Sequence, residues 1–237
     1  LLVTSMLILS ACGTTAIEST QEASTDSTDA PAATEVVEEP TAEPVEEPAL
    51  GVEVGQTGFG QDGAEVGYAF IVTNLDDQLI GDSEYQVSVY DANDVVVGTD
   101  SGSVVTIGPG QQIGIAGSLF VNDETVEVDR IDVQFRATDR MIFEEEFVFT
   151  AENVNYMPDD ISPSVSGVVS SSYEQDFGNL VVFAIAYDEA DEIIGGGYNF
   201  LDFIPAQGQS AIDVSITAAG DPARVELYPL LSILSLE

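Results

Sequence analysis

The chain of 237 residues contains no histidine, no lysine and no tryptophan, and only one cysteine. Without histidine it lacks the commonest general base and the Ser-His and Cys-His arrangements of nucleophilic catalysis. Without lysine it lacks the side chain that forms Schiff bases in covalent catalysis. Carboxylate pairs remain, but among 43 acidic residues chance pairs are unavoidable and carry no signal. We therefore expect a protein that is not an enzyme.

Positive charge is almost equally scarce. All four basic residues are arginines, and against 43 acids they leave a formal net charge of −39. Nucleic acids are bound through clustered cations, so this composition excludes a nucleic-acid partner. Solubility and adaptation to a saline habitat would each explain the acidity. An acidic surface is not attracted to anionic lipid, so a membrane attachment needs another cause.

The single cysteine indicates such a cause. Cys12 follows an apolar stretch that ends in Leu9-Ser10-Ala11. A run of about 10 apolar residues is too short to span a bilayer and is typical of an export signal. The small residues before Cys12 resemble the lipobox of bacterial lipoproteins, which implies a lipidated cysteine. We expect residues 1–11 to be an N-terminally truncated signal peptide and the protein to be extracytoplasmic, anchored to the cell membrane; the alternative is a secreted protein with an incidental cysteine.

The next segment, residues 12–50, has a composition unlike the rest of the chain. After Cys12 it consists largely of Ser, Thr, Ala, Pro and Glu, with ten acids, no base and no aromatic residue. Such a segment buries too little apolar surface to offset the entropy lost on ordering. We expect a disordered acidic linker, with an acidic segment that binds a partner as the alternative.

From about residue 51 the pattern becomes that of β-strands. Apolar and polar residues alternate in short runs, for example in 68–74, 85–91, 112–121 and 130–135, and Gly, Asn, Asp and Pro separate the runs. Alternation with period two predicts strands, and no segment keeps a helical period. The expected fold class is all-β, with Ig-like antiparallel β-sandwiches.

An internal repeat predicts two such domains. The stretch YDANDVVVG begins at Tyr90, and YDEADEIIG begins at Tyr187, an offset of 97 positions. Arg130-Ile131-Asp132-Val133 likewise matches residues 224–227 at an offset of 94. Small changes of offset are what loop insertions between matched strands produce. We expect domains at 51–152 and 153–237, with one long sandwich as the alternative.

These matched stretches resemble a known family. VSVYDANDVVVG, IGPGQQIGIAG and RIDVQF in the first copy, with FAIAYDEADEIIGG, IPAQGQSAIDVSI and ARVELY in the second, are similar to the FxLYD domain. The resemblance implies a small β-sandwich module of secreted bacterial proteins and lipoproteins. Val87 and Ala184 replace the expected Phe, while Val89 and Ala186 replace the expected Leu. The motif implies a fold and supplies no catalytic residues.

The repeated stretch has two interpretations. Its acidic loops could bind calcium, although neither has the ligand spacing of an EF-hand. The favoured interpretation is a hairpin, in which Asp91 and Asp188 accept hydrogen bonds from loop amides and Gly98 relieves a bend. In that case the motif is structural, and its residues are Tyr90, Asp91, Gly98, Tyr187, Asp188 and Gly195.

Two further features complete the expectations for function. Calcium is considered at an interdomain junction, with acidic candidates Asp76, Asp77, Asp159 and Asp160; no other cofactor is expected. The apolar residues 227–237 are too few for a membrane helix, and they either close the second core or form an interaction patch. We expect a non-catalytic, lipid-anchored envelope protein that binds, adheres to or spaces an envelope protein or glycan. The alternative is a calcium- or small-ligand-binding protein with its site at the junction.

Overall fold

The computed structural model describes residues 51–139, 148–159 and 162–236, and strands account for most of them. The expected signal peptide, Cys12, the acidic linker and Asp160 lie outside the described residues. The elements are β1 (Val52–Asp62), β2 (Glu65–Asn74), β3 (Ile80–Tyr90), β4 (Val96–Ile107), β5 (Gln112–Phe120), β6 (Arg130–Asp139), β7 (Thr150–Met157), β8 (Ser164–Ser170), β9 (Phe177–Tyr187), β10 (Ile193–Ile204), β11 (Gln209–Ser215), β12 (Thr217–Ala218), β13 (Arg224–Leu230) and the 3-10 helix η1 (Ile233–Leu236).

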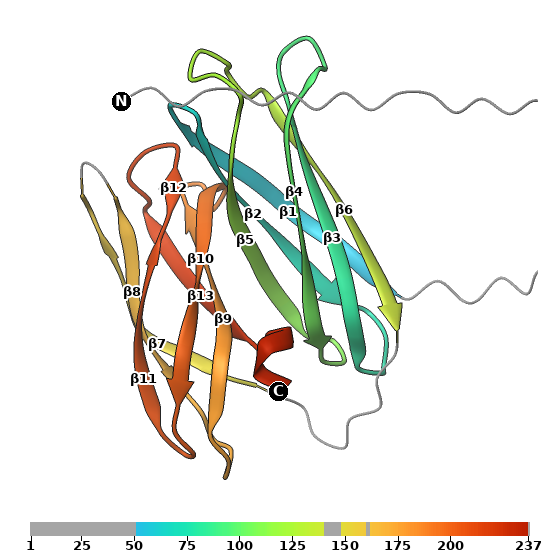
Figure 1. Ribbon diagram of the computed structural model, residues 1–237, viewed down its shortest axis with the longest axis vertical. Coiled ribbons are helices and arrows are strands. Elements are labelled where there is room, and N and C mark those ends of the chain that lie inside the picture. Colours follow the sequence, from blue (N-terminus) through green and yellow to red (C-terminus); the bar gives the residue numbers. More distant parts are fainter. Residues whose placement is uncertain (1–50, 140–147, 160–161, 237) are drawn as a thin grey trace, which may run out of the picture. The chain divides into compact units, whose positions relative to one another are not determined.

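The strands form four antiparallel sheets, which confirms the all-β class. Their orders are β1-β2-β5 and β4-β3-β6 in the first half of the described chain (51–139), and β11-β8-β7 and β12-β10-β9-β13 in the second half (148–236). The two halves therefore repeat one strand order, with β7, β8, β9, β10, β11 and β13 in the places of β1 to β6. Figure 1 shows the four sheets side by side.

The sheets pack as layers with the β1-β2-β5 and β12-β10-β9-β13 sheets inside. One apolar cluster joins residues of both inner sheets and of β3 and β4, and a second fills the space between the β12-β10-β9-β13 and β11-β8-β7 sheets. Strand β9 contributes to both clusters, Phe183 and Ile185 to the first and Val182 and Ala184 to the second. Because successive side chains point to opposite faces, this strand is buried on both sides.

This double burial corrects the alternation expected for residues 68–74. Tyr68 to Val72 are all buried, since β2 is covered by one sheet on each face. Strands buried on both faces are apolar along their whole length. Strand β3, in contrast, alternates as expected, with exposed Glu84 and Gln86 and buried Val87. The run of continuous apolar residues is therefore the mark of an inner strand.

The two inner sheets approach closely because small residues line their contact. A Cβ atom added to Gly58 would lie 2.7 Å from the carbonyl carbon of Ile193, and one added to Gly67 would lie 2.8 Å from the carbonyl oxygen of Gly196. A Cβ on Gly196 would lie 2.8 Å from Ala116 Cβ. Glycine is required here by the close approach of two backbones.

The expected boundary between residues 152 and 153 falls inside β7. Thr150, Ala151 and Glu152 pair with β8, and the strand continues to Met157. The first strand of the second half therefore starts a few residues earlier than expected, while the division into two domains stays a prediction. No helix within the described residues is long and apolar enough to cross a membrane.

Candidate functional site

The first Tyr-Asp stretch forms the hairpin between β3 and β4. The backbone amide of Asp94 donates to the Asp91 carbonyl oxygen (3.0 Å), and the Asp91 carboxylate accepts from the amides of Asn93 and Val95 (2.9 Å each). Asp94 has a φ of 59°, so a left-handed residue closes the turn. These bonds to the ionised form lower the pKa of Asp91, that from Val95 being the largest contribution.

The second stretch repeats this geometry between β9 and β10. The Asp188 carboxylate accepts from the amides of Ala190 (2.8 Å) and Glu192 (2.9 Å), and Asp191 has a φ of 61°. Both hairpins also contain a register shift close to the turn. The first strand pair beyond the shift, counted away from the turn, is Val89 with Gly98 in one copy and Ala186 with Gly195 in the other. The two matched glycines therefore follow a β-bulge in each copy.

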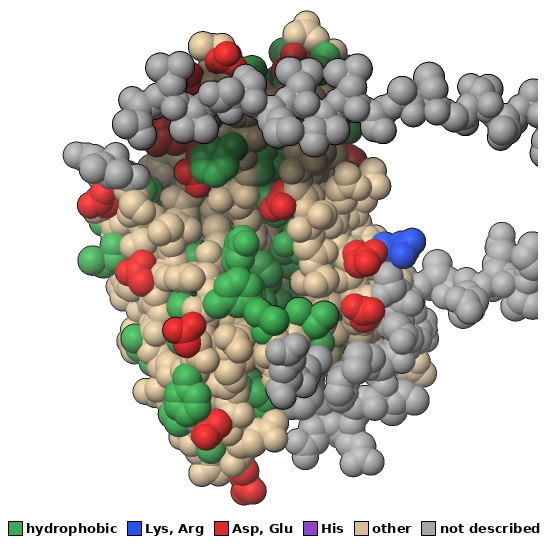
Figure 2. Space-filling view, viewed as in Figure 1, with side chains coloured by type: hydrophobic (Ala, Val, Ile, Leu, Met, Phe, Trp, Pro, Cys, Tyr) green, Lys and Arg blue, Asp and Glu red, His purple; other side chains and the backbone are tan. Residues whose placement is uncertain are grey.

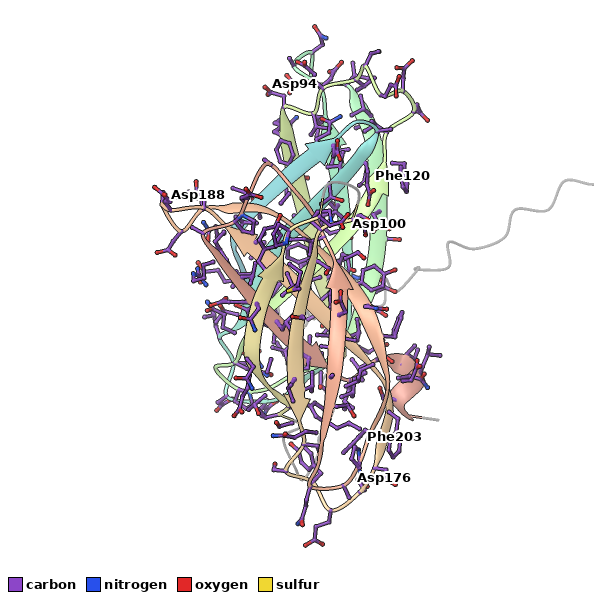
Figure 3. The ribbon with its side chains drawn as sticks, turned by 90° about the vertical axis from the view of Figure 1, so that its left-hand side faces the viewer. Asp94, Asp100, Phe120, Asp176, Asp188 and Phe203 are labelled. Atoms are coloured by element: carbon purple, nitrogen blue, oxygen red, sulfur yellow. The ribbon has the colours of Figure 1, made fainter. Side chains whose placement is uncertain are left out.

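An arginine covers the tyrosine in both copies. Arg130 stacks on the Tyr90 ring and Arg224 on the Tyr187 ring, each with its guanidinium carbon 3.7 Å from the ring centroid. Arg130 also pairs with Asp94 (2.9 Å), and Arg224 pairs with Asp191 (3.1 Å). Figure 3 shows Asp94 and Asp188 in two separate loops. The geometry is that of a closed hairpin, with the first carboxylate bonded to its own loop.

The candidate calcium ligands lie in different loops. Asp76 and Asp77 follow β2, and the Asp76 carboxylate accepts from the Gly51 amide (3.0 Å). Asp159 follows β7, and its carboxylate accepts from the Ser162 amide (3.1 Å). Within 51–139, 148–159 and 162–236, no group of three or more acidic, Cys or His side chains could hold a metal ion. These residues therefore form no metal centre together.

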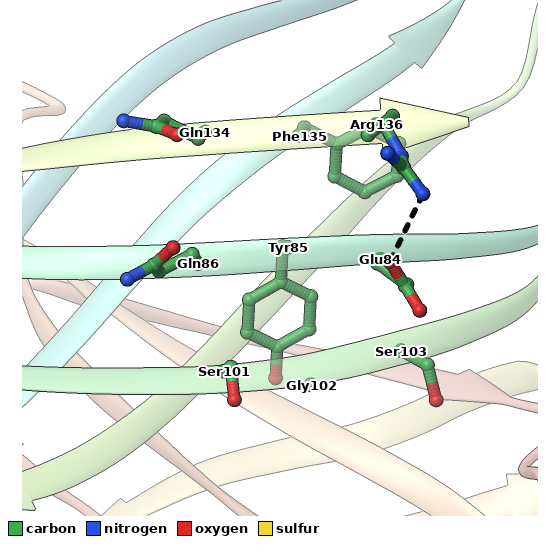
Figure 4. A pocket seen from close by; sticks show the side chains of 9 residues that line it. All are labelled: Glu84, Tyr85, Gln86, Ser101, Gly102, Ser103, Gln134, Phe135 and Arg136. Carbon is green, nitrogen blue, oxygen red and sulfur yellow. Dashed lines mark ion pairs between the residues drawn. The ribbon is translucent and has the colours of Figure 1, made fainter. Parts of the chain in front are cut away.

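A shallow hollow of about 750 Å³ lies over the β4-β3-β6 sheet, and Figure 4 shows it from close by. Gln86, Gln134 and two serines of β4 line it, and Glu84 pairs with Arg136 at 3.6 Å. Both members of this ion pair are mostly exposed, and exposed pairs contribute little to stability. The hollow is a solvated sheet face with mostly polar side chains, and the buried Tyr85 and the ring of Phe135 complete its lining.

A second cavity, here called the groove, has a different lining. It measures about 210 Å³ and lies between β4 of the first half and β9, β10 and η1 of the second. Tyr198 and Phe200 of β10 are 48% and 41% exposed there, and Ile233 and Leu234 of η1 are 65% and 46% exposed. Figure 2 shows hydrophobic side chains gathered near the middle of the molecular face in view. The groove is the largest concentration of exposed apolar side chains that the described cavities contain.

The wall of the groove on the β4 side is polar and fixed in place. The Tyr68 hydroxyl donates to Asp100 Oδ2 (2.6 Å), and the Ser101 amide donates to Asp100 Oδ1 (2.8 Å). Burial raises the pKa of Tyr85 to about 12 and raises that of Tyr68 further. Gly102 leaves room for the Tyr85 ring, because a Cβ atom there would lie 2.9 Å from Tyr85 Cε1. Asp100 is thus held in one orientation.

Sequence reasoning did not single out any residue of the groove except the apolar C-terminal run. For that run the two alternatives are closure of the core and an exposed interaction patch, and each applies to a part of it. The structure buries Leu227, Leu230 and Leu231, whereas Ile233 and Leu234 are exposed. The signal that was overlooked is the spacing of Tyr198 and Phe200. Two aromatic residues at positions i and i+2 of a strand lie on one face.

Comparisons with known proteins assign no family to the chain. No protein-family description and no curated protein matches it. Among solved structures it is similar to red sea bream transglutaminase, with 9% identity and a TM-score of 0.24 over 77% of this chain. It is also similar to the C-terminal globular domain of an oligosaccharyltransferase from Pyrococcus abyssi, with 7% identity and a TM-score of 0.21 over 77% of this chain. The match spans 31% and 49% of those two chains.

Proposed function

We propose that the chain is a non-catalytic protein of the cell envelope, held at the membrane by a lipid on Cys12, whose β-sandwich body binds an envelope protein or glycan in the groove. The observation that carries the proposal is the exposure of Tyr198 and Phe200 beside Ile233 and Leu234. Contiguous exposed apolar side chains with a polar rim mark interaction and ligand sites. Its position between strands of both halves also supports the small-ligand alternative.

The composition supports the absence of catalysis. The chain has no histidine and no lysine, and its single cysteine directly follows the export-type apolar run. The one carboxylate of the groove, Asp100, is engaged by the Tyr68 hydroxyl and the Ser101 amide, and no cysteine is among the described residues that line the groove beside it. The hairpin aspartates, for their part, are bonded to their own loop amides. Binding is therefore the activity that these residues support best.

Two measurements test the proposal. In cells that express the full chain behind an export signal, labelled palmitate should mark the protein, and Cys12→Ser should lose the label. The unlipidated Cys12→Ser chain should then sediment with isolated envelopes. Adding Tyr198→Ser should reduce the sedimented fraction, whereas Phe203→Ser should not, because Phe203 is 53% exposed on the same strand but does not line the groove. Equal sedimentation of both variants, or none of the parent, contradicts the binding proposal.

A further inference from the structure

We propose that the groove binds a trimethylammonium group, the cationic head of choline, carried by an envelope component. This inference rests on the proposed function, because it assigns a ligand chemistry to the same groove. It combines three observations: aromatic rings that surround a small space, one fixed carboxylate at its wall, and the absence of any basic side chain among the described residues that line it.

The aromatic lining has the form of a partial cage. Tyr85 and Phe183 are almost fully buried at its base, and Tyr198 and Phe200 stand half-exposed at its rim. The Phe183 and Tyr198 rings have centroids 6.2 Å apart and are tilted by 54°, while Tyr198 and Phe200 meet at 5.9 Å and 88°. All four aromatic side chains line the same cavity, so a ligand in the groove lies against aromatic rings. A cation within about 6 Å of a ring centroid is attracted by the negative face of the ring.

The charge of the site favours a cation over a neutral ligand. Asp100 is the one charged residue among the described residues that line the groove. Its two oxygens are held by the Tyr68 hydroxyl and the Ser101 amide, so the carboxylate is oriented before a ligand arrives. Such preorganisation reduces the entropy lost on binding. The net charge of −39 adds a long-range attraction for cations.

The remaining polar groups favour a methylated ammonium over other cations. A primary ammonium brings three N–H donors, each of which needs an acceptor, whereas the exposed rim of the groove consists of Tyr198, Phe200, Ile233 and Leu234. Calcium takes six to eight oxygen ligands, which one carboxylate does not supply. A trimethylammonium group has no N–H donor and makes apolar contact through its methyl groups. A cavity of about 210 Å³ admits a group of this size.

The first experiment compares choline with its uncharged analogue, in which a tert-butyl group replaces trimethylammonium. The full-length protein is titrated with each by calorimetry at constant ionic strength, with sodium chloride as the blank. We expect choline to bind saturably and about 2- to 30-fold more tightly than the analogue, the range that one cation–π contact supplies. Equal affinity for both, or no saturable choline binding, overturns the inference.

Three variants test the assigned groups. Tyr198→Leu keeps the apolar volume but removes a ring, and Asp100→Asn keeps an acceptor for Tyr68 but removes the charge. Each should weaken choline binding about 2- to 30-fold and leave binding of the uncharged analogue unchanged. The matched control Phe203→Leu, on the same strand as Tyr198 but outside the groove, should bind choline like the parent. Circular dichroism verifies that each variant is folded. Unchanged choline affinity in Tyr198→Leu contradicts the assignment.

A last measurement separates this inference from the proposed function. Choline, and not the uncharged analogue, should release the Cys12→Ser chain from isolated envelopes. If the chain stays on the envelopes in excess choline while Tyr198→Ser still reduces sedimentation, the groove binds an envelope component of other chemistry. The trimethylammonium inference is then wrong and the proposed function stands. If Tyr198→Ser and Phe203→Ser sediment alike, the proposed function itself is wrong.

Discussion

Replacement of Gly58 by alanine tests the close contact between the two inner sheets. The added Cβ would lie 2.7 Å from the Ile193 carbonyl carbon and 2.8 Å from Ile193 Cβ, where ordinary contacts begin at 3.4 Å. The Ile193 carbonyl oxygen lies nearer still, so the sheets must separate locally by more than about 0.7 Å, and even a gap of that size forfeits roughly a quarter to a half of each contact energy. The obstacle is backbone, which cannot change rotamer. We expect a loss of about 2–3 kcal/mol, the upper part of the range for overpacked cores.

Gly55→Ala is the matched control on the same strand. Its Cβ would meet nothing nearer than the Ile71 carbonyl oxygen at 3.8 Å, so its stability should stay within about 0.5 kcal/mol of the parent. Urea unfolding of both variants is followed by far-ultraviolet circular dichroism and tyrosine fluorescence, since the chain has no tryptophan. At about 2–4 °C per kcal/mol, Gly58→Ala should melt roughly 4–12 °C lower. If both variants unfold alike, the close-contact explanation is refuted.

Three further predictions follow from hydrogen bonds and pKa directions. Because the pKa of Asp91 is lowered in the fold, its stabilisation is present above the unfolded value and is lost as pH falls through the folded value. Asp91→Asn should therefore be less stable at neutral pH, and the difference in urea midpoint should begin to shrink as pH falls below about 4. A difference that stays unchanged in acid contradicts this prediction. The pKa of Tyr85 is raised to about 12, so the stability that the protonated hydroxyl contributes is fully present below about pH 10 and is lost as pH rises through 12. Tyr85→Phe should therefore shift alkaline unfolding, measured by circular dichroism, to higher pH. A shift to lower pH would oppose the assignment. Asn74→Ala should lower the free energy of unfolding by about 1–3 kcal/mol, measured by thermal unfolding, because the buried amide donates to the carbonyls of Gln78, Ile107 and Gly108. Asn155→Ala, at an exposed position, is the control. Equal losses of stability in the two variants would show that these bonds contribute nothing.

Local chemistry made the hairpins predictable. Asp91 and Asp188 are followed by small and polar residues, and their side chains bond their own loop amides, so the turn depends on residues next to one another in the chain. The alternation of β3 is equally local, because one face meets water. Such features are written in the sequence and need no knowledge of the rest of the fold.

Layer order, in contrast, depends on contacts between distant strands. The buried run from Tyr68 to Val72 shows that β2 is covered on both faces, but not by which sheet. The groove required the same missing information. Tyr198 and Phe200 remain exposed because the β1-β2-β5 sheet covers β10 near Gly196 and not farther along, which no spacing within residues 193–204 discloses.

Residues at equivalent positions of the two halves explain why no further sheet packs on the outer sheets of the described chain. Strand pairing places Gln86 opposite Gln134 on the outer face of the β4-β3-β6 sheet, and Phe183 opposite Tyr228 at the matching place in the second half. The same sheet face is therefore polar and solvated in one half, and apolar and packed against a neighbouring sheet in the other. Strand β4 carries Ser101 where β10 carries Tyr198.

The opposite outer face follows the same rule. Gly58 and Gly67, which allow the β1-β2-β5 sheet to touch its neighbour, have Asn155 and Ser164 at the matching places of β7 and β8. Asn155 is exposed and Ser164 is partly exposed. A polar outer face at each end of a stack prevents further copies from adding to it, as capping repeats do in solenoid proteins. The groove is then the part of the inner apolar face that the stacking leaves uncovered, which explains why aromatic side chains remain exposed there on an otherwise polar and acidic surface.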